Sequence, residues 1–314
     1  MQGLDICRLF FEEYGRPMLR GQFAAYEDRI AAGVCGAGSE CFGFDDETSR
    51  DHDFFAGFAL WLTEEDEAEI GFRLLRAYNR LPDEFMGVKL EAKSSFPVGK
   101  FGVKTIPEFL RGAIGQSDPP QTWREWFYLP EHALAQAVNG EIFTDPLGEM
   151  TRVRDTLKNG MPLDVKRKKI AAHCALAAQS GQYNFMRCCR HGEPLAAQTA
   201  LFEFTHHALR LMFALSGEYL PYYKWRFRAL KKLPRFAAFY DDFEKLLTTP
   251  NADGTIAQKQ QIVEKTADAI IQQLRRQAYS NSESDYLENH ALSVTSQIES
   301  NEIRALHLMD FGES

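Results

Sequence analysis

Two short segments of the sequence carry residue types that could hold a metal-bound phosphate. Gly38 and Ser39 form a glycine–serine turn, and Asp51-His52-Asp53 begins twelve residues after Ser39. Because side chains alternate faces along a strand, Asp51 and Asp53 would point the same way. Two carboxylates on one face suit Mg²⁺ or Mn²⁺, and Mg²⁺ is commonly bound by one or two carboxylates together with substrate phosphates.

The glycine–serine turn could supply the groups that bind phosphate. Gly38 allows a close approach of the backbone, and backbone N–H groups, helped by the Ser39 hydroxyl, can hold phosphate oxygens. Turn and carboxylates would then bracket a metal-bound triphosphate. The alternative is a plain turn followed by a solvated strand entry, but Asp-x-Asp leading directly into FFAGFAL is costly unless something pairs those charges.

Strands and helices that could position these residues are visible in the hydrophobic pattern. The first 148 residues predict a helix over 4–30, restarted at Pro17, and a second helix that begins after Thr63, where acidic residues favour a helix N-terminus. The same part predicts a strand that runs into a tight turn over 31–39, and further strands at 52–62, 86–92, 101–106 and 141–145. Long helical patterns then follow at 163–190, 194–216, 235–248 and 256–279. We therefore expect an α+β chain, with a mixed sheet and flanking helices over 1–148 and an all-α helical bundle over 149–314.

The turn and the two carboxylates together resemble a known signature. Gly-Ser, about a dozen residues and then Asp-x-Asp is typical of the polymerase-β-like nucleotidyltransferase superfamily, and GSECFGFDDETSRDHD (38–53) is similar to a largely uncharacterised bacterial family within it. The resemblance extends through GEIFTD (140–145) and YLPYYKW (219–225), about 220 residues. Its layout is similar to that of the small antibiotic nucleotidyltransferases. It implies a nucleotidyltransferase-like N-terminal domain in which Asp51 and Asp53 hold metal and Gly38 and Ser39 hold the β- and γ-phosphates.

The mechanism that the resemblance implies needs a third carboxylate, which binds metal or takes a proton from the attacking hydroxyl. Glu91 is the first candidate, because it lies in a predicted strand and shares a face with Lys89; a solvent-exposed strand is the competing interpretation. Asp145 is the second candidate, although a turn before Pro146 is the favoured interpretation. Glu108 is the weakest, because it follows Pro107 in what resembles the first turn of a helix.

The C-terminal half contains a dense basic cluster with interleaved aromatic residues. In the resembled family the segment around Lys224 would lie across the cleft from the metal, so Lys224 could contact the triphosphate; a solvated elbow between helices is the alternative. The basic cluster comprises Lys224, Arg226, Arg228, Lys231, Lys232 and Arg235. His206-His207 is expected to lie in the core or a cleft rather than to bind metal.

Composition excludes several classes of protein. The chain has 314 residues, 45% hydrophobic and 25% charged, which is ordinary for globular proteins and excludes disorder. A net charge of −8 argues against nucleic acid as a partner. No apolar run is long enough to span a membrane and no export signal is visible, so we expect a cytoplasmic protein with reduced, buried thiols.

These observations favour an enzyme. It would use Mg²⁺ to transfer a nucleoside monophosphate, AMP from ATP being favoured, onto a hydroxyl of a small molecule and release pyrophosphate. One alternative keeps this chemistry with a protein or RNA acceptor, as in toxin-neutralising relatives. Another is a non-catalytic nucleotide-binding protein with a decayed site.

Overall fold

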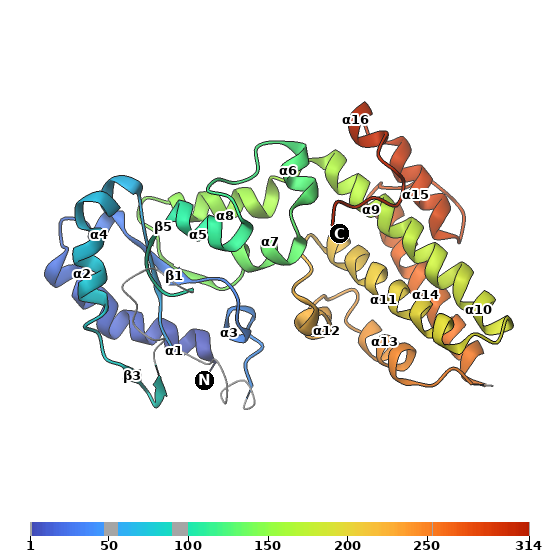
Figure 1. Ribbon diagram of the computed structural model, residues 1–314, viewed down its shortest axis with the longest axis horizontal. Coiled ribbons are helices and arrows are strands. Elements are labelled where there is room, and N and C mark those ends of the chain that lie inside the picture. Colours follow the sequence, from blue (N-terminus) through green and yellow to red (C-terminus); the bar gives the residue numbers. More distant parts are fainter. Residues whose placement is uncertain (1, 47–55, 90–99, 253, 314) are drawn as a thin grey trace. The chain divides into compact units, whose positions relative to one another are not determined.

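The computed structural model describes residues 2–46, 56–89, 100–252 and 254–313 (Figure 1). Contacts between residues divide it into two units: unit 1 comprises Met1–Gln121 and Ala133–Gly160, and unit 2 comprises Thr122–His132 and Met161–Ser314. This division by contacts does not test independent folding, so the boundary after residue 148 stays a prediction.

Unit 1 is built on a four-stranded mixed sheet. The strand order is β5-β2-β1-β6, in which β1 is antiparallel to β2 and β6, and β2 is parallel to β5. These strands are β1 (Ala31–Val34), β2 (Ala59–Leu62), β5 (Gly102–Thr105) and β6 (Glu141–Thr144), beside a separate hairpin of β3 (Glu84–Phe85) and β4 (Val88–Lys89). The helices are α1 (Gly3–Phe10), α2 (Arg16–Gln22), α3 (Ser39–Phe42), α4 (Glu64–Tyr78), α5 (Ile106–Ile114) and α8 (Glu149–Asn159). The expected sheet with flanking helices is thus confirmed.

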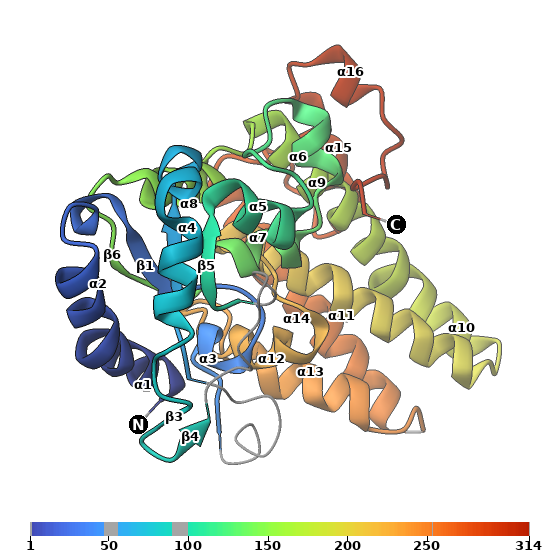
Figure 2. The same cartoon turned by 60° about the vertical axis from the view of Figure 1, so that its left-hand side comes forward.

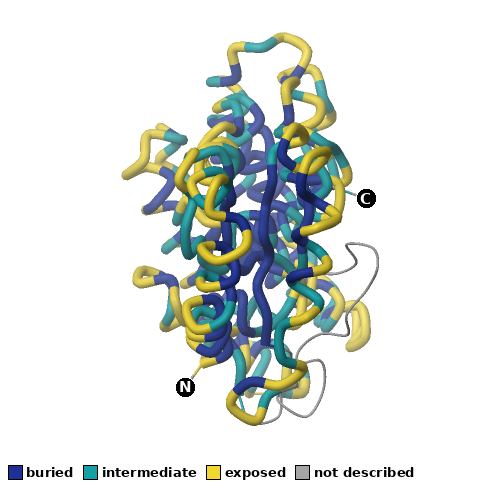
Figure 3. The backbone as a smooth tube through the Cα atoms, turned by 90° about the vertical axis from the view of Figure 1, so that its left-hand side faces the viewer, coloured by how far each residue is buried: buried dark blue, intermediate teal, exposed yellow. Residues whose placement is uncertain are grey.

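Both faces of the sheet are covered, which explains why its central strands are apolar throughout. Val34, Leu60 and Leu62 pack into a core with residues of α1, α2 and α4. On the opposite face Trp61 packs against Phe109 of α5, with ring centroids 5.7 Å apart. Figure 3, which looks onto this unit, shows buried backbone through its middle and exposed backbone outside.

The helix predicted over 4–30 is interrupted before Pro17 and ends at Gln22. A π-helical segment, Phe11–Gly15, separates α1 from α2, and Pro17 lies in the first turn of α2, where a proline is tolerated. A Cβ at Gly15 would lie 2.7 Å from the rings of both Phe11 and Phe58. The close packing of these rings on the backbone therefore requires glycine at position 15.

Strand directions bring several loops to one end of the sheet. Because β1 and β2 are antiparallel, with Gly33 opposite Ala59, the end of β1 and the beginning of β2 lie together. The beginnings of β5 and β6 lie at the same end, because Gly102 pairs with Ala59 and Glu141 with Val34. The turn that contains Gly38 therefore meets the chain that enters β2 and β5.

The regular elements of unit 2 that the structure describes are all helices, joined by turns and loops (Figure 2). Its longest helices, α9, α11 and α14, pack along one another together with α15. They are α9 (Leu163–Ala177), α10 (Met186–Arg190), α11 (Pro194–Ser216), α12 (Arg226–Leu230), α13 (Phe239–Thr248), α14 (Thr255–Arg276), α15 (Leu287–Ser296) and α16 (Asn301–Arg304), with α6 (Trp123–Tyr128) and the beginning of α7 (Glu131–Val138). The expected helical C-terminal region is confirmed.

Two further properties bear on the sequence predictions. Among the described residues, no helix combines the length and the apolar character needed to cross a membrane. All six cysteines are free; Cys188 and Cys189 are half-buried, and the other four are buried. The expectation of buried thiols therefore holds for those four.

Candidate functional site

The predicted phosphate-binding turn leads from β1 into α3. Gly38 immediately precedes Ser39, the first residue of α3, and both are half-buried. Gly36 and Gly38 have φ of 126° and 134°, a conformation that residues with a side chain rarely adopt. The turn therefore depends on glycine at both positions. Asp51, Asp53 and Glu91 lie outside the described residues.

A buried ion pair lies directly behind Gly38. The Lys100 ammonium contacts the Glu40 carboxylate, and the two side chains are only 14% and 2% exposed. A Cβ at Gly38 would lie 2.6 Å from both carboxylate oxygens of Glu40 and 2.7 Å from Nζ of Lys100. Glycine at position 38 is therefore needed to make room for this pair, in addition to its conformation.

The turn is also held from the far side by an asparagine. The Asn139 side chain accepts from the backbone N–H of Gly36 at 2.9 Å and donates to the Gly36 carbonyl at 2.8 Å. Arg154 of α8 donates to the carbonyls of Val138 and Asn139, which fixes the segment that carries this amide. The turn is thus anchored by a side chain from the loop before β6.

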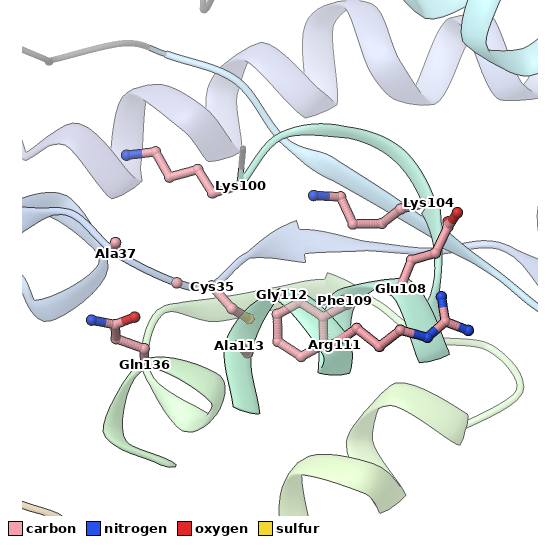
Figure 4. Close-up of a pocket in the computed structure, with 11 residues that line it drawn as sticks. Cys35, Ala37, Lys100, Lys104, Glu108, Phe109, Arg111, Gly112, Ala113 and Gln136 are labelled. Atoms are coloured by element: carbon pink, nitrogen blue, oxygen red, sulfur yellow. The ribbon is translucent and has the colours of Figure 1, made fainter. Parts of the chain in front are cut away.

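A pocket of about 450 Å³ opens beside the turn (Figure 4). Three of its lining residues carry positive charge, Lys100, Lys104 and Arg111, and one carries negative charge, Glu108. In Figure 4 the side chains of Lys100 and Lys104 extend with both ammonium groups pointing in the same direction. Because Glu40 pairs with Lys100 behind the turn, the other charged lining residues, Lys104 and Arg111 against Glu108, leave the pocket with a small excess of positive charge. Its remaining lining residues are Cys35, Gly36, Ala37, Phe109, Gly112, Ala113 and Gln136.

Burial sets the protonation of two groups in this pocket. It lowers the pKa of Lys100 to about 8, so this side chain is mainly an ammonium at neutral pH and loses its proton in mild alkali. Burial also raises the pKa of Cys35 to about 11. The Cys35 thiol is therefore protonated at neutral pH and is a poor nucleophile.

The two described candidates for the third carboxylate both cap helices. Asp145 accepts from the backbone N–H of Thr151 at 2.7 Å and follows β6 at the end of the sheet away from the Gly38 turn, since Thr144 pairs with Ala32. It is a turn residue, as favoured from the sequence. Glu108 forms a capping box with Thr105 at the start of α5 and lines the pocket.

The basic cluster of the C-terminal half lies in unit 2. Lys224 is exposed, and its Nζ lies 4.8 Å from the centre of the Trp225 ring. A contact between Lys224 and a phosphate held in unit 1 stays a prediction.

The adjacent histidines of α11 lie in the core or at a pocket, as expected from the sequence. His207 is buried, with its Nδ1 3.1 Å from Nδ1 of His173. His206 contacts two arginines.

The described part of the chain contains no group of three or more His, Cys, Asp or Glu residues placed to hold a metal ion. Asp51 and Asp53, to which the sequence assigns that role, lie outside the described residues. The metal assignment therefore stays a prediction based on the spacing of these two carboxylates.

Sequence reasoning missed Lys100, Glu40 and Asn139. Glu40 is adjacent to Ser39 but was assigned no role, and Lys100 directly precedes the predicted strand at 101–106. The partners in these contacts are 60 and 103 residues apart, so no local spacing indicates them. The one indication in the sequence is that Lys100 directly precedes a predicted strand. Chain segments that lead into neighbouring parallel strands lie at the same end of a sheet.

Comparisons with known proteins give partial matches. A family model described as a domain of unknown function, DUF4037, matches residues 126–226. None of the curated proteins matches the sequence. Among solved structures, the chain is similar to a nucleotidyltransferase-like protein from Exiguobacterium sibiricum, with 13% identity and a TM-score of 0.33, over 91% of this chain and 88% of that one. Similarity at this level identifies neither the reaction nor the substrate.

Proposed function

We propose that the chain binds a nucleoside triphosphate, ATP being favoured, at the Gly38 turn of unit 1 and transfers its nucleoside monophosphate to a hydroxyl of a small molecule. The observation that carries the proposal is the positively charged pocket beside this turn, lined by Lys100, Lys104 and Arg111. A triphosphate is strongly anionic, and lysine and arginine are the side chains that bind phosphate oxygens.

The position of the pocket adds to this support. It borders the end of β1, and the chain enters β2 at the same end of the sheet after the segment that contains Asp51 and Asp53. A metal-bound triphosphate requires oxygen ligands for the metal, the role that the sequence gives to Asp51 and Asp53, and donors for the phosphates, which the cations of the pocket would supply.

In the proposed reaction, the acceptor hydroxyl oxygen forms a bond to the α-phosphorus, and the bond from that phosphorus to the bridging oxygen breaks. Pyrophosphate leaves, and a carboxylate takes the hydroxyl proton. Asp51 and Asp53 would hold Mg²⁺, which supplies a Lewis acid for the phosphate oxygens when bound. Lys100, while paired with Glu40, would donate one of its remaining N–H groups to a phosphate oxygen. Asn139 would keep the turn in its binding conformation.

Glu91 remains the first choice for the proton-accepting carboxylate. Asp145 lies at the other end of the sheet, and the Glu108 carboxylate accepts from the backbone N–H of Thr105 at 2.8 Å. The acceptor stays a small molecule with a hydroxyl in this proposal. A protein or RNA acceptor would use the same chemistry, and a decayed site would bind nucleotide without turnover.

Calorimetry with Mg·ATP, followed by pyrophosphate release with a panel of polyols, tests the proposal. We expect wild type to bind Mg·ATP and Lys100→Met to bind it at least about tenfold more weakly, because a charged hydrogen bond to phosphate is lost. Lys158→Met, at an exposed lysine of α8 that does not line the pocket, is the matched control. No binding of Mg·ATP by wild type, or equal binding by wild type and Lys100→Met, would contradict the proposal. Binding without pyrophosphate release for any acceptor would support the non-catalytic alternative.

A further inference from the structure

A second pocket lies entirely within unit 2. Its volume is about 650 Å³, within the range usual for small-molecule sites. The lining comes mainly from α11 and from the segment that begins at Tyr223, with Met309 and Phe311 and one residue each of α9 and α13. Most of it is apolar or aromatic, including Phe202, Leu209, Phe227, Leu247, Met309 and Phe311. An apolar body would therefore be buried favourably here.

Arg226 is a half-buried cation in this lining, and no carboxylate of the described residues forms an ion pair with it. Its guanidinium contacts the Pro221 carbonyl at 3.4 Å and Nδ1 of His206 at 3.1 Å. The neighbouring Arg210 differs, because it pairs with the carboxylates of Glu313 at 2.5 Å and Glu131 at 3.6 Å. No carboxylate of the described residues therefore lies within ion-pair distance of Arg226, although Glu313 and Glu131, which pair with Arg210, also act on its charge from further away.

His206 does not supply an anionic partner for Arg226. Its Nε2 lies 3.0 Å from Nε of Arg210 and its Nδ1 lies 3.1 Å from a guanidinium nitrogen of Arg226, and a neutral ring has only one acceptor nitrogen. Burial, and then the charges of Arg210 and Arg226, lower the pKa of His206 to about 4, so the ring is neutral at pH 7. The single acceptor nitrogen of the neutral ring cannot serve both arginines, so one donor of this group is left without an acceptor on His206.

A further unpartnered polar group lines the same pocket. Thr205 is 2% exposed, and its hydroxyl has no hydrogen-bond partner, which is rare for a buried polar group. Glu203 also lines the pocket, but its side chain is 59% exposed and lies 3.6 Å from His207. It therefore does not neutralise Arg226.

We propose that this pocket binds a small organic acid, a single carboxylate on an aromatic or aliphatic body, with Arg226 as the residue that recognises the carboxylate. The carboxylate oxygens would accept from the Arg226 guanidinium and from Nδ1 of His206. The Thr205 hydroxyl would bond to a polar atom of the ligand, and the body would pack on the apolar lining. The site is separate from the nucleotide site proposed in unit 1, so either can fail alone.

Isothermal titration of the full chain with naphthoate tests this assignment, with uncharged naphthamide as the matched ligand. We expect saturable binding of naphthoate, binding at least about tenfold weaker for naphthamide, and a similar loss for Arg226→Met. Arg228→Met removes an exposed arginine that does not line the pocket and should leave the affinity unchanged. Arg226→Lys, which keeps the charge but not the planar fork, should fall between wild type and Arg226→Met.

Several results of these titrations would overturn the proposal. Equal affinity for naphthoate and naphthamide, no binding of either, or unchanged affinity in a folded Arg226→Met would each overturn the proposal. Tighter binding of naphthyl phosphate than of naphthoate would overturn the carboxylate assignment. If Arg226→Met does not fold, Thr205→Val provides the second variant, with an expected loss of a few-fold in naphthoate affinity. Unchanged affinity in Thr205→Val would then count against the site.

Discussion

Gly38 shapes the candidate site in two ways. Its backbone conformation forms the turn, and its lack of a side chain leaves room for the ion pair of Lys100 and Glu40. We predict that Gly38→Ala lowers the free energy of unfolding by about 1–3 kcal/mol, because the new Cβ would collide with Glu40 and Lys100 at a φ of 134°. Urea denaturation measures this loss. Gly115→Ala is the matched control, since Gly115 has a φ of 78° but no atom within 4 Å of an added Cβ. Equal losses in both variants would show that the ion pair plays no part.

Lys100 gives the site a dependence on pH. Its pKa is lowered to about 8 by burial, so the ammonium present below that pH becomes a neutral amine above it. We therefore predict that affinity for Mg·ATP falls as the pH rises from 7 to 9.5. In Lys100→Arg the guanidinium stays charged over this range, so its affinity should change less. Parallel pH profiles for the two proteins would contradict a role of Lys100 in phosphate binding.

Asn139 links the turn to the loop before β6. Asn139→Ala removes both hydrogen bonds to Gly36, and we predict a loss of stability of about 1–3 kcal/mol together with weaker Mg·ATP binding. Thermal denaturation and calorimetry on the same samples separate the two effects. Asn159→Ala, at an exposed asparagine that ends α8, should change neither. A loss of stability with unchanged affinity would make Asn139 a purely structural residue.

At the scale of elements, the end of the chain is fastened to α9 by a buried lysine. Nζ of Lys168 donates to the carbonyls of His307 at 2.7 Å and Leu308 at 2.9 Å, and the residue is fully buried. We predict that Lys168→Met destabilises the protein by about 1–3 kcal/mol, because two carbonyls lose their donor. Lys166→Met, at a half-buried neighbour, is the control in urea denaturation. Equal stability of the two variants would contradict this role.

Elements with clear end signals were predicted closely from the sequence. The prediction of a helix over 194–216 matches α11 at both ends, because Pro194 occupies its first turn and Gly217 ends it with a φ of 73°. The strands predicted at 31–39, 101–106 and 141–145 contain β1, β5 and β6. The apolar run of β1 reflects a central strand that is buried on both faces, whereas β6 at the edge is half-buried throughout.

Elements whose form depends on distant contacts were not predicted. The helix predicted over 163–190 contains a π-helical segment, Ala178–Phe185, where a Cβ at Gly181 would lie 2.3 Å from the Phe204 ring. Because Phe204 belongs to α11, no local pattern indicates this approach. The short helices α6, α7 and α8 were also missed, since each has at most a few turns.

The candidate site likewise has a local part, which the sequence predicts, and contacts between distant residues, which it does not predict. Its glycine–serine turn could be found from spacing, because the residues that form it are neighbours in the chain. The contacts of Lys100 with Glu40 and of Asn139 with Gly36 could not, because only the order and direction of the strands bring these residues together. Asp51, Asp53 and Glu91 remain sequence-based assignments.

At the scale of the whole molecule, the net charge of −8 conceals two opposite local charges. Residues 31–70 contain eleven acidic residues and one basic residue, whereas residues 224–235 contain six basic residues and no acidic one. The first segment contributes the Gly38 turn of unit 1, and the second belongs to unit 2. If both segments contact one triphosphate, Lys224→Met should weaken Mg·ATP binding, whereas an independent site in unit 1 predicts no change.

The central claim is that Asp51 and Asp53 hold the metal of a nucleotide bound at the Gly38 turn. Calorimetric titration of Mg·ATP into wild type and into the double variant Asp51→Asn, Asp53→Asn tests it most directly, with Asp28→Asn as a control at an exposed carboxylate. We predict that wild type and Asp28→Asn bind Mg·ATP and that the double variant, although folded, loses magnesium-dependent binding. Equal binding by all three proteins, or none by wild type, would contradict the account.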